Sequence, residues 1–437
     1  MSAPIDRALL PRGATVAAGR LAVGGCDLEE LADRFGTPLV VYDEDELRTR
    51  CREYRDAFGD DNVAFAGKAF LCVAMARLVA DEGLHLDVAS GGELHTAMRA
   101  GFPPERLVFH GNNKSGDELR TALTAGVGRI VVDSFDELDR IESLVDDGLD
   151  APAVLVRVTP GVEAHTHEYI ETGTEDSKFG FGVGGDVALE AAVRASESAA
   201  MQLRGLHCHI GSQVWNLTSY VRALDVVTQL AATVAARTDA PVEELNVGGG
   251  LGIPYHAGDA APTIAEYATA VRDAFTRACS DARLDPSPRL MVEPGRSIAG
   301  PAGLTLYRVG TVKHIPDVRT YVGVDGGMSD NPRPATYGAA YEAALPARAT
   351  ARRPLVATVA GKHCEQGDLL VRDASLPEDV EVGDVLAVPA TGAYGYSMAS
   401  NYNRLPRPAV VFVRDGEARV VVRRETLDDV VRLDETE

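Results

Sequence analysis

The residues with the clearest chemical potential are a lysine at the end of an apolar run and a charged pair in a proline-containing loop. Lys68 ends the run VAFAGK. Partial burial there would lower the pKa of its amine and free it to form a Schiff base with an aldehyde or ketone. Glu293 and Arg296 lie three residues apart in EPGRS, where they could bind opposite parts of one ligand. The structural alternatives are a lysine that extends to solvent and an ordinary surface ion pair.

Two further stretches combine histidine or glycine with the end of an apolar run. His207 and His209 lie on one face of a predicted strand, so they could be half of a metal site, or one imidazole could lie flat against an aromatic cofactor ring. We find no matching carboxylates and histidines elsewhere, and we expect no metal. Gly248, Gly249 and Gly250 lack a Cβ, so their backbone amides could approach an anion closely, although glycine is also common in tight turns.

These residues follow a recurring unit of a short apolar run, a turn and a segment with helical periodicity. The predicted strands are 63–68, 84–90, 107–112, 129–134, 153–158, 203–211, 243–250 and 289–295. Predicted helix starts carry a Ser or Thr three residues before a Glu, the spacing of a capping box: Ser90/Glu93, Ser115/Glu118, Ser134/Glu137 and Thr263/Glu266. Eight such units predict an α/β fold with a closed (β/α)₈ barrel of the TIM type, although the pattern also allows an open doubly wound sheet. In such a barrel Lys68, His209, the three glycines, Glu293 and Arg296 share the rim at the C-terminal ends of the strands.

The rest of the chain has a different pattern. After about residue 300, alternating apolar runs separated by turns predict a second, mainly antiparallel β domain, a sandwich or barrel. RLAVGG (20–25) resembles these strands. We therefore expect an N-terminal segment, 1–39, that contributes to the β domain, a coenzyme-binding barrel at 40–299 and a C-terminal β domain at 300–437.

Composition limits the classes of partner. The chain of 437 residues has a formal net charge of -22, which disfavours binding to nucleic acid or anionic membranes and favours a small-molecule substrate. No apolar segment approaches the roughly 18 residues that span a bilayer, and no signal peptide is evident, so we expect a cytoplasmic protein. The 6 cysteines show no CxxC spacing and indicate neither a disulfide framework nor a zinc site.

Seven blocks together resemble the pyridoxal-phosphate-dependent basic amino-acid decarboxylases with an alanine-racemase-like barrel, most closely the diaminopimelate decarboxylases. In order they are FAGKAF, HCHIGSQ, NVGGGLG, EPGRSI, DGGMSDNPRPATYGA, HCEQGD and GAYGYSMASNYN. TGTEDSKFG (172–180) resembles a further family segment. The resemblance covers roughly residues 40–410. It implies that pyridoxal 5'-phosphate is the coenzyme and that the reaction converts meso-2,6-diaminopimelate to L-lysine and carbon dioxide, the last step of lysine biosynthesis.

The resemblance also implies roles for individual residues toward the coenzyme. Lys68 would hold it through a Schiff base, Glu293 would pair with the pyridine nitrogen, and His209 would stack on the ring. Tyr394 would reach it from the β domain. The phosphate would be surrounded by Ser212, Gly248, Gly249, Gly250 and Arg296.

Substrate roles are implied in the same way. The retained carboxylate would be bound by Arg296, Arg333 and Tyr337, with Tyr394 also in the substrate site. Cys364 would come from the other subunit of a homodimer with shared active sites and protonate the carbanion. Glu365 would bind the distal ammonium group. One departure is visible, because the family's usual CESGD is CEQGD here, with Gln366 in place of serine.

Three other functions compete with this interpretation. The first is a decarboxylase of the same fold that acts on ornithine, arginine or carboxynorspermidine; Glu365 and the DNPRP block disfavour it. The second is a metal-dependent barrel hydrolase that uses His207 and His209. The third is a non-catalytic homologue, which would have no chemical reason to keep Lys68 and Cys364.

Overall fold

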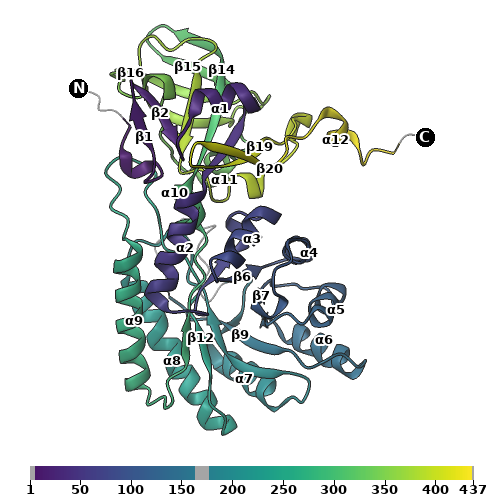
Figure 1. The fold of residues 1–437 in the computed structure, drawn as a ribbon. Coiled ribbons are helices and arrows are strands. Elements are labelled where there is room, and N and C mark those ends of the chain that lie inside the picture. The colour runs from purple at the N-terminus through teal and green to yellow at the C-terminus, as the bar shows by residue number, and fades with distance from the viewer. Residues whose placement is uncertain (1–4, 163–176, 436–437) are drawn as a thin grey trace. The chain divides into compact units, whose positions relative to one another are not determined.

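The computed structural model describes residues 5–162 and 177–435 (Figure 1). The chain forms two compact units. The β unit comprises Met1–Thr49, Ile253–Ala261 and Ile298–Glu437, and the barrel unit comprises Arg50–Gly252 and Pro262–Ser297. Most of the TGTEDSKFG segment lies outside the described residues.

Eight parallel strands form the barrel, in sequence order around the sheet. They are β5 (Ala64–Ala66), β6 (His85–Val88), β7 (Leu107–Phe109), β8 (Arg129–Val132), β9 (Ala153–Thr159), β11 (Gln202–Cys208), β12 (Glu244–Asn246) and β13 (Arg289–Met291). The ring closes where Val63 pairs with Val292, since the Ala64 N–H donates to the Val292 carbonyl at 2.9 Å. This closure confirms the predicted barrel and excludes the open sheet. The short strand β10 (Phe181–Gly182) pairs with β9 beside the ring.

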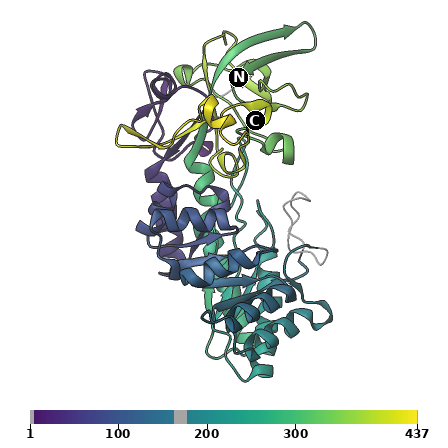
Figure 2. The same cartoon turned by 90° about the vertical axis from the view of Figure 1, so that its right-hand side faces the viewer.

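Helices lie on the outside of these strands (Figure 1, Figure 2). They are α3 (Val73–Asp81), α4 (Gly91–Ala100), α5 (Gly116–Ala125), α6 (Phe135–Asp146), α7 (Val187–Glu197), α8 (Thr218–Thr238) and α9 (Ile264–Asp281). All four predicted cap hydroxyls accept the expected N–H bond, and Ser115 and Thr263 form complete capping boxes. At the other two caps the glutamate instead accepts from the N–H one residue further back, that of Ala89 or Asp133.

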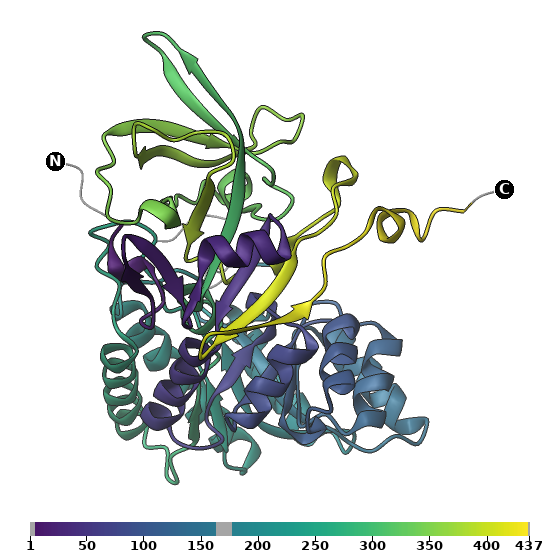
Figure 3. The ribbon, with the colours of Figure 1, turned by 45° about the horizontal axis from the view of Figure 1, so that its top comes forward.

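The β unit is built on a mixed sheet. Its strand order is β17-β16-β15-β14-β4-β19-β20, with β18 also paired to β14. The β15–β16 and β4–β19 pairs are parallel and the other pairs are antiparallel. The C-terminal hairpin of β19 and β20 is yellow in Figure 3. The strands are β4 (Leu39–Asp43), β14 (Gly303–Ile315), β15 (Arg319–Val324), β16 (Leu355–Ala360), β17 (Leu369–Leu376), β18 (Val385–Pro389), β19 (Ala409–Arg414) and β20 (Glu417–Val422).

The remaining elements of the β unit are small. A separate sheet contains β1 (Thr15–Ala17), β2 (Arg20–Val23) and β3 (Cys26–Asp27), and the helices are α1 (Leu28–Phe35), α11 (Arg333–Tyr337) and α12 (Leu427–Val431). The chain passes between the units within α2 (Glu44–Phe58), at the two ends of Ile253–Ala261, and within α10 (Arg296–Ala302). No helix in the described part of the chain is both long and apolar enough to span a membrane.

The units differ from the predicted segments at three places, and the smallest difference is that Ile298 and Ala299 belong to the β unit. Residues 40–49 belong to the β unit, because β4 pairs with β14 and β19 in the mixed sheet. Residues 253–261 also belong there, because Ile253 and Tyr255 pack in a hydrophobic core with residues of β14 to β18.

Candidate active site

The barrel unit brings most of the predicted residues to one end of its strands. Lys68 lies in the short 3-10 helix Gly67–Ala69 that follows β5, and its side chain is exposed. His209 follows β11, and the three glycines follow β12. Glu293 and Arg296 follow β13. Because all these strands are parallel, the residues share the C-terminal rim, as predicted.

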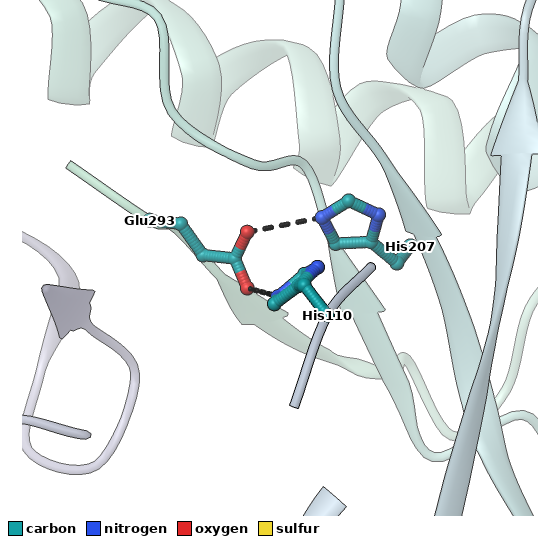
Figure 4. A group of neighbouring side chains, drawn as sticks. All are labelled: His110, His207 and Glu293. Carbon is teal, nitrogen blue, oxygen red and sulfur yellow. Dashed lines mark hydrogen bonds and ion pairs between the residues drawn. The ribbon is translucent and has the colours of Figure 1, made fainter. Parts of the chain in front are cut away.

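Glu293 is held by side chains from three other strand ends, and Figure 4 shows two of them, His110 and His207. Its Oε1 accepts from His110 Nε2 at 2.8 Å and from Asn246 Nδ2 at 2.8 Å, and its Oε2 accepts from His207 Nε2 at 3.0 Å. A carboxylate offers about four acceptor sites, two on each oxygen. The bonds from the described residues therefore fill Oε1 and leave one site on Oε2.

The electrostatics keep this carboxylate ionised. Burial by itself would raise the pKa of Glu293, but His110 and His207 outweigh it and hold that pKa well below its usual range. Burial lowers the pKa of His207 to about 4. At neutral pH the ionised Glu293 carboxylate therefore accepts a hydrogen bond from the neutral His207 imidazole. Its Oε2 can accept one more hydrogen bond, for example from a protonated ring nitrogen.

Groups that could bind an anion follow the neighbouring strands β11, β12 and β13. Arg296 is 5% exposed, and its Nε and Nη2 donate to Ser212 Oγ at 3.2 and 2.8 Å. The Gly249 N–H donates to His209 Nδ1 at 3.3 Å. Burial, together with Lys68 and Arg157, lowers the pKa of His209 well below its usual value, which keeps that ring neutral. A guanidinium, a hydroxyl and a glycine turn are groups that suit a phosphate dianion.

The glycine turn also has a packing reason that the sequence did not indicate. A Cβ at Gly249 would lie 2.1 Å from the Glu293 carbonyl oxygen, and one at Gly250 would lie 2.3 Å from the Gly211 carbonyl oxygen. Gly250 also has a φ of +112°. The turn therefore requires glycine for close backbone approach, whether or not it binds an anion.

Sequence reasoning missed His110 and Asn246, and it did not pair His207 with Glu293. The missed residues stand at strand ends, His110 after the apolar run LVF in LVFHGN and Asn246 after Leu245 in EELNVGGG. That signal was available, but it does not say which strands become neighbours across the barrel.

His110, His207 and Glu293 also form a set whose ligand atoms lie within 4.8 Å of one another, which could hold a metal ion. The hydrolase hypothesis paired His207 with His209, and His209 is not a member of this set. Both imidazoles of the set bond directly to the carboxylate.

The β unit contains the predicted arginine. Arg333 begins α11 and is 5% exposed. Its guanidinium lies 4.7 Å from the ring centre of Tyr255, and its Nη1 donates to Tyr341 Oη at 2.5 Å. It forms no ion pair with any described residue, and a buried cation of this kind is suited to an anionic ligand. Tyr337 ends the same helix and is half-buried, as is Tyr394, which has a φ of +59°.

Cys364 and Glu365 lie in an exposed loop between β16 and β17. The Cys364 N–H donates to Asn403 Oδ1 at 3.2 Å, and the same oxygen lies 3.2 Å from His363 Nδ1. The His363 N–H donates to Asp368 Oδ2 at 2.9 Å. These bonds hold the backbone of the loop and leave the thiol accessible.

Comparisons with known proteins show the family of this chain. The family model for the pyridoxal-dependent decarboxylases, pyridoxal binding domain, matches residues 44–300. The diaminopimelate decarboxylase of Actinosynnema pretiosum is 50% identical over 428 residues, covering 98% of this chain and 95% of the relative. That of Bacillus subtilis is 49% identical, covering 95% of each chain.

Solved structures agree as well. The crystal structure of diaminopimelate decarboxylase from M. jannaschii matches with a TM-score of 0.90 and 34% identity over 98% of both chains, and that enzyme also has a structure in complex with L-lysine. A lysine/ornithine decarboxylase from Vibrio vulnificus matches at 22% identity and is similar in fold alone. The chain belongs to the pyridoxal-dependent decarboxylases and, within them, to the diaminopimelate decarboxylases.

Proposed function

We propose that this protein uses pyridoxal 5'-phosphate to convert meso-2,6-diaminopimelate to L-lysine and carbon dioxide, the last step of lysine biosynthesis. The observation that carries the proposal is the Glu293 carboxylate, which is ionised, held by three donors and left with one acceptor site. This is the partner that a protonated pyridine nitrogen requires. Family membership supplies the reaction class.

The coenzyme, when bound, supplies a ring that accepts the electron pair left by the departing carbon dioxide. The chain's own residues bind and orient it. The Lys68 amine would hold the coenzyme, and the Glu293 carboxylate would keep its ring nitrogen protonated. His209, neutral because of its lowered pKa, would cover the ring face, while Arg296, Ser212 and the glycine turn would bind the phosphate.

Two groups of the β unit would select the substrate. Arg333, buried against Tyr255 and Tyr341, binds the carboxylate that is retained, together with Arg296, Tyr337 and Tyr394. Glu365 binds the distal ammonium. Two opposed charge contacts at one carbon would distinguish its handedness. Ornithine lacks the distal carboxylate and would leave the Arg333 guanidinium without an anionic partner.

We further propose a homodimer with shared sites, in which the partner's loop supplies Cys364 to donate a proton to the substrate carbon. The exposure of this loop supports the proposal. We also propose that the enzyme acts in the cytoplasm, where thiols stay reduced, since all 6 cysteines are free.

The direct test is to incubate the purified protein with coenzyme and meso-diaminopimelate and to measure carbon dioxide and L-lysine. Lys68→Ala is expected to abolish turnover and borohydride-reducible attachment of the coenzyme. Lys313→Ala, which changes an exposed lysine in β14, is the matched control and should behave as the wild type. Reducible attachment in Lys68→Ala would contradict the role of Lys68.

Shared sites have their own test. Lys68→Ala and Cys364→Ala chains, each inactive alone, should regain activity when mixed, because a hybrid dimer contains one site with both residues. No recovery under conditions where subunits demonstrably exchange would exclude this arrangement.

The competing functions are separated by assays in which the substrate or the cofactor is changed. Comparable turnover of ornithine, arginine or carboxynorspermidine would favour the alternative decarboxylase. Coenzyme-independent hydrolysis that needs a metal would favour the barrel hydrolase. Absence of any turnover with the coenzyme bound would favour the non-catalytic homologue.

A further inference from the structure

Asn246, the last residue of β12, connects the two halves of the rim site. It is 0% exposed. Its Nδ2 donates to Glu293 Oε1 at 2.8 Å, and its Oδ1 accepts from the Gly248 N–H at 2.9 Å. One side chain therefore contacts both the carboxylate proposed to hold the ring nitrogen and the first glycine of the turn proposed to hold the phosphate.

The two contacts determine the orientation of this amide. A backbone N–H needs an acceptor and an ionised carboxylate needs a donor, so the oxygen must face Gly248 and the nitrogen must face Glu293. The main chain strengthens the link, because the Glu293 N–H donates to the Gly248 carbonyl at 2.8 Å. An aspartate at this position could still accept from the Gly248 N–H, but it would place a second carboxylate against Glu293.

We propose that Asn246 is a positioning residue that orients Glu293 and ties it to the glycine turn, which keeps one acceptor site of Oε2 available to the coenzyme's ring nitrogen. The proposal rests on the proposed function, since it assumes that Glu293 binds the coenzyme. Asn246 itself does not contact the reacting atoms. By filling Oε1 together with His110, it leaves the coenzyme a single oxygen to bond.

The test compares coenzyme binding by the wild type, Asn246→Asp and Asn246→Ala at two pH values. Two carboxylates at hydrogen-bond distance cannot both stay ionised, so they share a proton that is lost as the pH rises. The coenzyme dissociation constant of Asn246→Asp should therefore be about 10- to 100-fold above that of the wild type near pH 8 and recover near pH 5.5. Asn246→Ala lacks the second carboxylate and should be weakened at both pH values.

Other titratable groups surround Glu293 in every variant. His110 and His207 contact it, Asp87 and Arg157 act on it electrostatically, and Lys68 and His209 lie nearby. These groups are the same in each protein, so the comparison with the wild type at each pH isolates the substitution. Asn62→Asp, at a half-buried asparagine that donates to the Phe58 carbonyl, is the matched control and should bind as the wild type.

A kinetic readout serves if Asn246→Asp does not fold. With saturating coenzyme, Asn246→Ala should lower kcat about tenfold or more with little change in the substrate KM, because Glu293 acts on the coenzyme. Wild-type binding by Asn246→Asp at both pH values, or a raised KM with unchanged kcat in Asn246→Ala, would overturn the proposal while the proposed function stands. A wild-type protein that binds no coenzyme would overturn both.

Discussion

Asp330, in the DNPRP block just before α11, should make the stability of the fold depend on pH. It is 3% exposed, and its Oδ1 accepts from the Gly327 N–H at 2.7 Å. Burial raises its pKa from 3.8 to about 7, because the ionised form is poorly solvated there. We expect Asp330→Asn to stabilise the protein at alkaline pH, since asparagine keeps an oxygen for Gly327 and does not ionise.

The sign and size follow from linkage. Between pH 3.8 and about 7 the folded chain holds a proton at Asp330 that the unfolded chain has released, so the free energy of unfolding falls as the pH rises. The stabilisation is fully present below about pH 3.8 and is lost as the pH rises through about 7. At about 1.4 kcal/mol for each pKa unit, the whole contribution is about 4 kcal/mol.

The assay is urea denaturation of the wild type and Asp330→Asn at several pH values between about 5 and 8. The difference in free energy of unfolding should grow by about 2–3 kcal/mol in favour of the variant across this range. Asp373→Asn, at an exposed aspartate of β17, is the control and should show a nearly constant difference. A constant difference for Asp330→Asn as well would refute the reasoning.

Three further predictions concern the site. Gly249→Ala should lower both the melting temperature and coenzyme retention, because its Cβ would meet the Glu293 carbonyl oxygen at 2.1 Å. Thermal unfolding and gel filtration with coenzyme measure the two effects, and wild-type values would contradict the prediction. Arg333→Lys should raise the KM for meso-diaminopimelate about tenfold or more with coenzyme binding unchanged, because a lysine cannot present the paired N–H donors of a guanidinium that lies over Tyr255. An unchanged KM would remove Arg333 from the substrate site. Glu365→Gln should lose most of kcat/KM without losing coenzyme, and steady-state assays on meso-diaminopimelate and ornithine will show whether the preference falls with it.

Local patterns predicted the barrel unit well. The alternation of apolar runs and helical segments located all eight barrel strands, and Ser115 and Thr263 form the capping boxes expected of them. These features depend on residues a few positions apart. The assignment of β4 to the β unit was not predictable in this way. Its apolar sequence indicates a strand, but it does not show that the strand pairs with β14 and β19.

The coenzyme side of the site was only partly predictable. Glu293 was chosen for its type and its place after a predicted strand, but its partners come from β7, β11 and β12. His110 lies 183 residues away along the chain. A lone polar residue at a strand end has the same sequence signal whether it faces solvent or a carboxylate.

By itself, the sequence determined the βα units, their order, the rim that carries Lys68 and Glu293, and the family to which the blocks belong. These follow from periodicity, capping and short motifs, which act over a few residues. Only the tertiary structure decided that Asn246 joins Glu293 to Gly248, and that Arg333 is buried against Tyr255 and Tyr341. The physical reason is that a hydrogen bond needs its donor and acceptor within about 3 Å, and only the closed barrel and the folded β unit bring such distant residues that close.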